Sequence, residues 1–138
     1  MDEGTDLKVL RIALVVVGIT FVIGVYTMTI SWPAGWTWDV EGAHSHYLQM
    51  IFGVYATLGV FLILAARDPL KNLSLIWFTV WSSVVHGGIM AIQAFVYPEH
   101  RGHLLGDVPA LLVIALVLAV LTPRGEQGVG ADARLARP

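Results

Sequence analysis

Cysteine is absent from this chain of 138 residues, and charged residues are scarce. Without thiols the protein can form no disulfide, no thiolate metal site and no cysteine nucleophile. Charged side chains make up 13% of the sequence, about half of the roughly 25% that is typical of a soluble domain. The net charge of −2 provides no basic surface for a polyanion. These shortages exclude a soluble enzyme, and they exclude nucleic acid as a partner.

A catalytic signature is also missing. The sequence has no glycine-rich phosphate loop, and no hydrolase or transferase motif can be identified in it. Ser82 and Ser83 precede His86 by one helical turn. A serine nucleophile, however, also needs an oriented base and an oxyanion hole, and neither can be assigned. The sequence therefore names no reaction and favours a protein that is not an enzyme.

Apolar residues, by contrast, make up 57% of the chain, and the mean hydropathy is +0.74. About 20 mostly apolar residues are needed to cross the hydrocarbon core of a bilayer. Four stretches reach this length, at residues 7–32, 46–66, 73–97 and 104–122. Charged residues or proline end the last three of them, as expected for helices.

The connections between these stretches are short, so helices that are neighbours in sequence should lie antiparallel in space. The sequence predicts an all-α integral membrane four-helix bundle with an up-down-up-down arrangement. Residues 1–123 form its single four-span membrane domain. Residues 124–138 are rich in Gly, Ala and Arg, and they are expected to form a flexible tail.

Lysine and arginine predict the orientation of the bundle. Seven of the eight fall on one predicted face of the membrane, and only Arg101 falls on the other; the seven are Lys8, Arg11, Arg67, Lys71, Arg124, Arg134 and Arg137. By the positive-inside rule both termini are cytoplasmic. The protein is then a multi-pass protein of a cytoplasmic (inner) membrane, with Trp32, Trp36 and Trp38 at the outer interface.

Polar side chains recur within the outer half of the predicted spans. His86 lies more than about 10 Å from the outer end of the third span, at 1.5 Å of helix rise per residue. Tyr55 lies at a comparable depth in the second span, so a Tyr55–His86 hydrogen bond is expected. Gln93 and Tyr97 follow His86 at helical spacing. Two interpretations remain open: an interhelical hydrogen-bond network, or a polar cavity that binds a ligand such as a quinone or another lipid, or that relays protons.

The five histidines all fall in the outer half or in the outer loops. Imidazole and carboxylate ligands suit zinc, copper or iron, so a divalent transition metal is a possible cofactor. The candidate ligands are His44, His46, His86, His100, His103 and Asp107. Of these, His100, His103 and Asp107 would share one face of a helix. Haem is not favoured, because no second histidine matches the depth of His86.

These metal candidates also have simpler explanations. On a helix, His44 and His46 would point about 200° apart, so they could chelate together only in an extended segment. Asp107 stands two residues before Pro109, which is the usual position of a helix N-cap. Histidines near a membrane interface are ordinary.

The residues from Ile51 to Phe95 resemble small bacterial four-helix membrane proteins. The pattern G-x-Y-x-x-L-G-x-F-L-x-L-A-A-R is similar to the second span of the DoxX-like and related families, and it is formed by Gly53, Tyr55, Leu58, Gly59 and Arg67. The resemblance covers a third of the chain. It implies a four-helix bundle in a bacterial cytoplasmic membrane, and it implies no catalytic residue.

The chain is just long enough to cross a membrane four times, and it lacks a catalytic constellation. The sequence therefore predicts a small non-enzymatic integral membrane protein, an accessory or structural subunit of a membrane assembly. Its partners would be the lipid bilayer and either other membrane subunits or further copies of itself. The alternative is a metal-binding or small-ligand-binding membrane protein that uses the outer-half cluster of His, Asp and Tyr side chains.

Overall fold

The computed structural model describes residues 3–38 and 45–123. Within these residues four helices are long and apolar enough to cross a membrane: Thr5–Ser31, His46–Ala65, Pro69–Val96 and Pro98–Leu121. The prediction of an all-helical chain with four apolar spans is confirmed. The predicted tail and His44 lie outside the described residues.

Three of the four spans combine an α-helix with a tighter or wider helical segment. The first contains α1 (Glu3–Ile19), the π-helical turn η1 (Thr20–Gly24) and α2 (Val25–Ser31), and the short 3-10 turn η2 (Pro33–Gly35) follows it. The second is α3 (His46–Ala65) alone. The third joins the 3-10 turn η4 (Pro69–Asn72) to α4 (Leu73–Val96), and the fourth joins η5 (Pro98–Leu104) to α5 (Asp107–Leu121).

The fourth span begins at Pro98, before the predicted start at residue 104, but its α-helix, α5, begins after it. Residue 104 ends the η5 turn, and α5 starts at Asp107 with Gly106 as its N-cap. The predicted role of Asp107 as N-cap is therefore wrong. Its carboxylate instead accepts hydrogen bonds from Trp38 and His103, described below.

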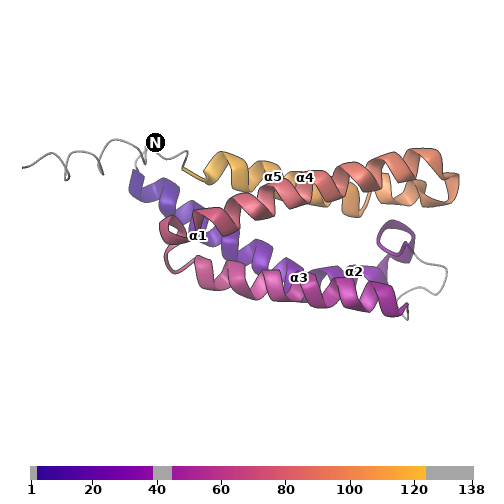
Figure 1. Cartoon of the computed structure of the whole chain (residues 1–138), viewed down its shortest axis with the longest axis horizontal. Coiled ribbons are helices and arrows are strands. Elements are labelled where there is room, and N and C mark those ends of the chain that lie inside the picture. Colours follow the sequence, from indigo (N-terminus) through magenta and orange to yellow (C-terminus); the bar gives the residue numbers. More distant parts are fainter. Residues whose placement is uncertain (1–2, 39–44, 124–138) are drawn as a thin grey trace, which may run out of the picture.

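The helices pack as two pairs, α1 with α3 and α4 with α5, and α1 also contacts α5. Figure 1 shows the chain running out along α1 and α2, back along α3, out along α4 and back along α5. The fully buried leucine and isoleucine side chains come from the parts of the helices nearest to the described ends of the chain: Leu10, Leu14, Leu62, Ile76 and Leu118. The core thus holds the two pairs together at that end, which we call the termini end. The opposite end carries Pro33–Trp38 and η5, and we call it the tryptophan end.

Two glycines allow α1 and α3 to cross at backbone contact. A Cβ atom added to Gly59 would lie 2.5 Å from the carbonyl oxygen of Gly18, and one added to Gly18 would lie 2.7 Å from the carbonyl oxygen of Gly59. The π-helical turn η1 begins two residues after Gly18 and also packs on α3. Such single π-helical turns occur often at functional sites.

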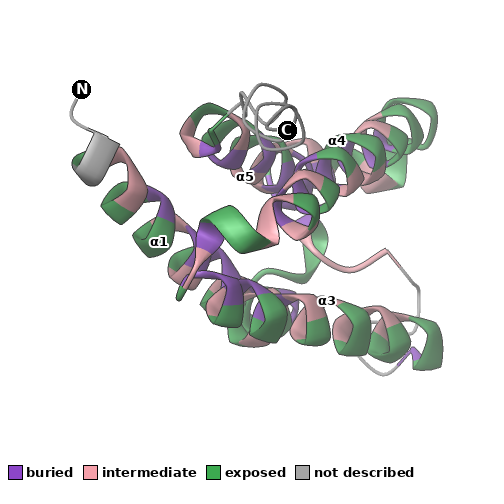
Figure 2. Ribbon diagram, turned by 60° about the vertical axis from the view of Figure 1, so that its left-hand side comes forward, coloured by how far each residue is buried: buried purple, intermediate pink, exposed green. Residues whose placement is uncertain are grey.

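The outward faces of the helices are apolar and exposed. Figure 2 shows exposed residues along the outer sides of α1, α3 and α4, with buried residues on the sides that face one another. Large side chains such as Val54, Phe61 and Phe95 are among the exposed ones. This pattern suits contact with lipid tails, because the exposure of apolar side chains to lipid carries no free-energy penalty.

Basic residues gather at the termini end. Lys8 and Arg11 lie on the first turns of α1, Arg67 and Lys71 lie in the connection between α3 and α4, and Arg101 lies at the tryptophan end. Lys71 Nζ donates a hydrogen bond to Asp68 Oδ2 at 2.8 Å, which lowers the pKa of that carboxyl group below its ordinary value. Because both side chains are well exposed, the pair contributes little to stability.

Candidate functional site

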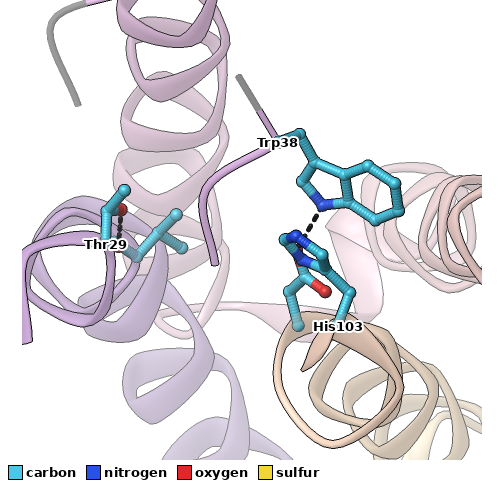
Figure 3. Close-up of polar contacts among 5 residues, drawn as sticks. Thr29, Trp38 and His103 are labelled. Carbon is cyan, nitrogen blue, oxygen red and sulfur yellow. Dashed lines mark hydrogen bonds and ion pairs between the residues drawn. The ribbon is translucent and has the colours of Figure 1, made fainter. Parts of the chain in front are cut away.

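A buried carboxylate joins three segments at the tryptophan end. Trp38 Nε1 donates a hydrogen bond to Asp107 Oδ2 at 2.7 Å, and His103 Nδ1 lies 2.9 Å from the same oxygen. The Trp38 indole also stacks on the His103 ring, with a centroid distance of 3.9 Å and an interplanar angle of 29°. Figure 3 shows Trp38 and His103 directed toward one another. Asp107 and His103 are both buried, so this contact is shielded from solvent and from lipid.

Two glycines bring the Trp38 segment against η5 and α5. A Cβ atom on Gly102 would collide with the carbonyl oxygen of Ala34, and one on Gly106 would collide with the carbonyl oxygen of Gly35. Only glycine permits this approach, because any side chain would displace backbone atoms. The close contact of η2 with η5 sets the position from which Trp38 reaches Asp107.

Aromatic rings extend this contact toward α4. His100 lies 4.9 Å from the Trp38 ring and 5.8 Å from the His103 ring, measured between centroids. Tyr97 meets His100 edge to face at 6.3 Å. The structure thus brings His100, His103 and Asp107 into one cluster around Trp38, although no single helix runs through the three residues. The contacts among them are ring contacts and a hydrogen bond.

A cavity of about 750 Å³ lies beside this cluster, between the α1–α3 pair and the α4–α5 pair. All four predicted ligand-binding residues line it, and so do three of the proposed metal ligands: Tyr55, His86, Gln93, Tyr97, His100 and Asp107. Much of the remaining wall is apolar and includes Phe21, Ile51, Met90, Leu111 and Ile114. His103 lies behind Asp107, buried, and His46 is exposed at the first turn of α3.

One polar contact bridges the two helix pairs within the cavity wall. Tyr55 Oη lies 3.3 Å from His86 Nδ1, which is the hydrogen bond predicted from their matching depths. The Tyr55 ring also forms a T-shaped contact with the Phe21 ring, at a centroid distance of 5.0 Å, and Phe21 belongs to the π-helical turn η1. The three rings therefore connect the first, second and third spans at mid-depth.

Two of the residues that line the cavity each have a covered polar atom without a hydrogen-bond partner within the part of the chain that the structure describes. Asp107 is 6% exposed, and its Oδ1 atom accepts no hydrogen bond although Oδ2 faces two nitrogens. Trp36 also lines the cavity, and its buried Nε1 atom has no acceptor. Each unpaired buried group of this kind costs about 1–3 kcal/mol. Both atoms are covered by neighbouring protein atoms, so they are not accessible from the cavity.

The metal candidates do not converge in the described segments. Residues 3–38 and 45–123 contain no group of three or more His, Cys, Asp or Glu side chains placed to hold one ion. His103 and Asp107 face each other through a hydrogen bond, and His86 faces Tyr55. The described donor atoms therefore suit hydrogen bonding better than coordination.

Sequence reasoning missed Trp36, Trp38 and Phe21 as site residues. The two tryptophans were assigned only to the membrane interface, which is where isolated indoles usually lie. The contact between Trp38 and Asp107 joins residues 69 positions apart. The sequence carries no signal for the π-helical turn that contains Phe21.

Four apolar helical spans with a partly polar cavity between two helix pairs define a small multi-pass membrane protein. The chain belongs to a family of unknown function, DUF6632, whose model matches residues 4–137. No curated protein and no solved structure matches it. The family match provides no link to the DoxX-like proteins.

Proposed function

We propose that this protein binds a lipid-soluble amphiphile in the cavity between its two helix pairs. One observation carries the proposal: a cavity of about 750 Å³ with a mostly apolar wall lies between the helix pairs, and its few polar lining residues include the hydrogen-bonded pair Tyr55 and His86. Small-molecule sites are typically concavities of about 300–1,000 Å³ with mostly apolar walls and a few orienting polar groups. The position of the cavity within the spans makes a membrane-dissolved ligand the natural occupant.

The cavity reaches the outer surface of the helices along α4. Val85 and Ile89 both line the cavity and are more than half exposed. Tyr97 and Tyr47 line it in the same way near the tryptophan end. Side chains of this kind would face lipid in a membrane, so an amphiphile can enter sideways from the bilayer without crossing the tryptophan-end loops.

The orientation that we infer places the cavity in the outer half of the membrane. It rests on the seven of eight basic residues that sequence analysis assigns to one face. Both termini are then cytoplasmic, the tryptophan end faces outward, and residues 124–138 form a cytoplasmic tail on a single membrane domain of an inner membrane.

An accessory or structural role in a larger membrane assembly is a second hypothesis. Its support is the extensive apolar outer surface, which lipid, other subunits or a second copy could each cover. Binding of an amphiphile in the cavity is the more specific hypothesis, because it assigns the ligand contacts to identified lining residues. A divalent metal has less support, because the described histidine and carboxylate side chains do not converge.

Filling the cavity tests the proposal. Ile114 is a partly buried residue of the cavity wall on α5. The Ile114→Trp variant should occupy the space that the ligand needs, while the protein stays folded because the volume already exists. Native mass spectrometry after extraction from native membranes in mild detergent should detect a bound small molecule on the wild type. Its occupancy should fall about tenfold or more in Ile114→Trp, a loss of at least 1.4 kcal/mol.

The Val113→Trp variant is the matched control, because Val113 is the preceding residue on α5 and is 57% exposed. It adds the same indole to the lipid-facing side and should leave occupancy unchanged. Equal occupancy in the two variants, or a wild type that carries no bound molecule, would contradict the proposal.

A further inference from the structure

We infer that the bound molecule presents an uncharged oxygen that accepts a hydrogen bond from the Tyr55–His86 pair, half-way along the membrane spans. This inference rests on the proposed function and names its ligand class: neutral lipids with an uncharged oxygen such as a ketone carbonyl, in preference to fatty acids and to plain hydrocarbons. It follows from the donor that the pair provides, from the depth of the pair, and from the lack of basic residues in the described lining of the cavity.

The pair offers a hydrogen-bond donor in either neutral tautomer of His86. If the Tyr55 hydroxyl donates to Nδ1, the imidazole proton is on Nε2. This second ring nitrogen has no hydrogen-bond partner within residues 3–38 and 45–123, and protein atoms do not cover it. If Nδ1–H instead donates to Tyr55 Oη, the phenol proton is not used within the pair. One N–H or O–H group therefore remains for a ligand oxygen in both cases.

Two other hydroxyl groups of the lining near this depth are already used. Thr20 Oγ1 donates to the carbonyl oxygen of Val16 at 2.9 Å, and Ser82 Oγ donates to the carbonyl oxygen of Thr79 at 3.2 Å. Both side chains line the cavity, but their protons are directed to the backbone of their own helices. The Tyr55–His86 pair is thus the better donor for a ligand at this level.

The depth of the pair selects the kind of lipid. Tyr55 lies in the middle of the 20-residue helix α3, and His86 lies close to the middle of the 24-residue helix α4. At 1.5 Å of rise per residue, the pair is about 15 Å from either end of α3. Charged head groups stay at the membrane interface, because burial of a charge among apolar groups is strongly unfavourable. A neutral lipid can bring an isolated oxygen to this depth.

The wall around the pair suits such a molecule. Among the described lining residues there is neither lysine nor arginine, so an anionic group would find no basic partner there. Phe21, Met90 and Ile114 provide apolar surface for the hydrocarbon part of the lipid. The exposed lining residues Val85 and Ile89 provide an opening through which a chain can extend into the bilayer.

Competition between matched probes tests the oxygen acceptor. The wild-type protein in lipid nanodiscs is photolabelled by a diazirine derivative of tridecan-7-one, and label on the lining residue Met90 is measured by peptide mass spectrometry. Tridecan-7-one, tridecane and dodecanoate then compete at equal mole fractions. The ketone differs from tridecane only by its mid-chain carbonyl. It should compete about threefold or more better than either of the others, as expected for one hydrogen bond within a membrane.

Infrared spectroscopy of tridecan-7-one with a carbon-13 carbonyl detects the hydrogen bond itself. In the wild type the bound carbonyl should absorb at a lower wavenumber than the ketone in protein-free bilayers. Tyr55→Phe and His86→Phe each leave one donor and should keep part of this shift. The double variant Tyr55→Phe/His86→Phe should abolish both the shift and the preference over tridecane. Tyr26→Phe, at a 53% exposed tyrosine outside the lining, is the matched control and should preserve both.

The outcomes separate the inference from the function on which it rests. Equal competition by tridecan-7-one and tridecane in the wild type, with labelling lost in Ile114→Trp, would overturn the acceptor inference and leave the cavity function intact. Stronger competition by dodecanoate would overturn it as well. A carbonyl shift that persists in the double variant would overturn the role of the Tyr55–His86 pair. If Met90 is labelled equally in the wild type and Ile114→Trp, or in neither, the proposed function itself fails. The wild-type competition decides even if the double variant does not fold.

Discussion

Gly59→Leu is expected to lower the free energy of unfolding by about 3 kcal/mol, as overpacking at a rigid contact does. The first side-chain carbon would already lie 2.5 Å from the carbonyl oxygen of Gly18 and 2.9 Å from a methyl group of Val22. The Gly18 oxygen is a backbone atom and cannot rotate away, so α1 and α3 would have to separate. Thermal unfolding in mild detergent, followed by circular dichroism, measures the change.

Gly53→Leu is the matched control on the same helix. A Cβ atom at Gly53 would meet no atom within 4 Å, so the new side chain enters open space on the surface of α3. Leucine also has a better helix propensity than glycine, by several tenths of a kcal/mol, and this benefit is common to both variants. Equal stability of Gly53→Leu and Gly59→Leu would show that the helices do not cross at Gly18 and Gly59.

Asp107→Ala should destabilise the tryptophan end by about 2–4 kcal/mol. The substitution leaves Trp38 Nε1 and the facing His103 nitrogen without an acceptor, and each unpaired buried donor costs about 1–3 kcal/mol. Release of Trp38 from the His103 ring should also change its fluorescence. Thermal unfolding and tryptophan emission together measure the effect. Glu99→Ala, at an exposed carboxylate in η5, is the control and should be close to neutral.

A double-mutant cycle assigns that loss to the Trp38 contact. Adding Trp38→Phe to Asp107→Ala removes one of the stranded donors and keeps an aromatic ring over His103. The double variant should therefore be more stable than the sum of the two single losses implies, by about 0.5–1 kcal/mol. Strict additivity, or an Asp107→Ala variant as stable as Glu99→Ala, would mean that the Trp38–Asp107 hydrogen bond does not stabilise the protein.

The spans could be predicted from the sequence because lipid restricts the chain to a small set of structures. Backbone groups in a bilayer must pair within their own segment, so an apolar stretch of sufficient length becomes a helix. Depth along a helix follows from residue count, which is why the Tyr55–His86 hydrogen bond could be predicted as well. Gln93 and Tyr97 were found through the same helical spacing and line the cavity with them.

The rest of the site depends on contacts that periodicity does not encode. Trp38 reaches Asp107 only because Gly102 and Gly106 allow another turn to approach their backbone. That contact also explains why Asp107 is not the N-cap that its position before Pro109 suggested. The cavity arises where the two helix pairs enclose space near the tryptophan end, and no single segment contains a signal for a space between segments.

The central claim is that an amphiphile occupies the cavity, and photo-crosslinking tests it most directly. A long-chain alcohol with a diazirine in its chain is added to the protein in nanodiscs, illuminated, and its adducts are located by peptide mass spectrometry. Adducts are predicted on Met90 and Leu111, which line the cavity and are only 8% and 7% exposed. Adducts confined to outward-facing residues such as Val113 and Leu116, which are 57% and 64% exposed, would contradict the account.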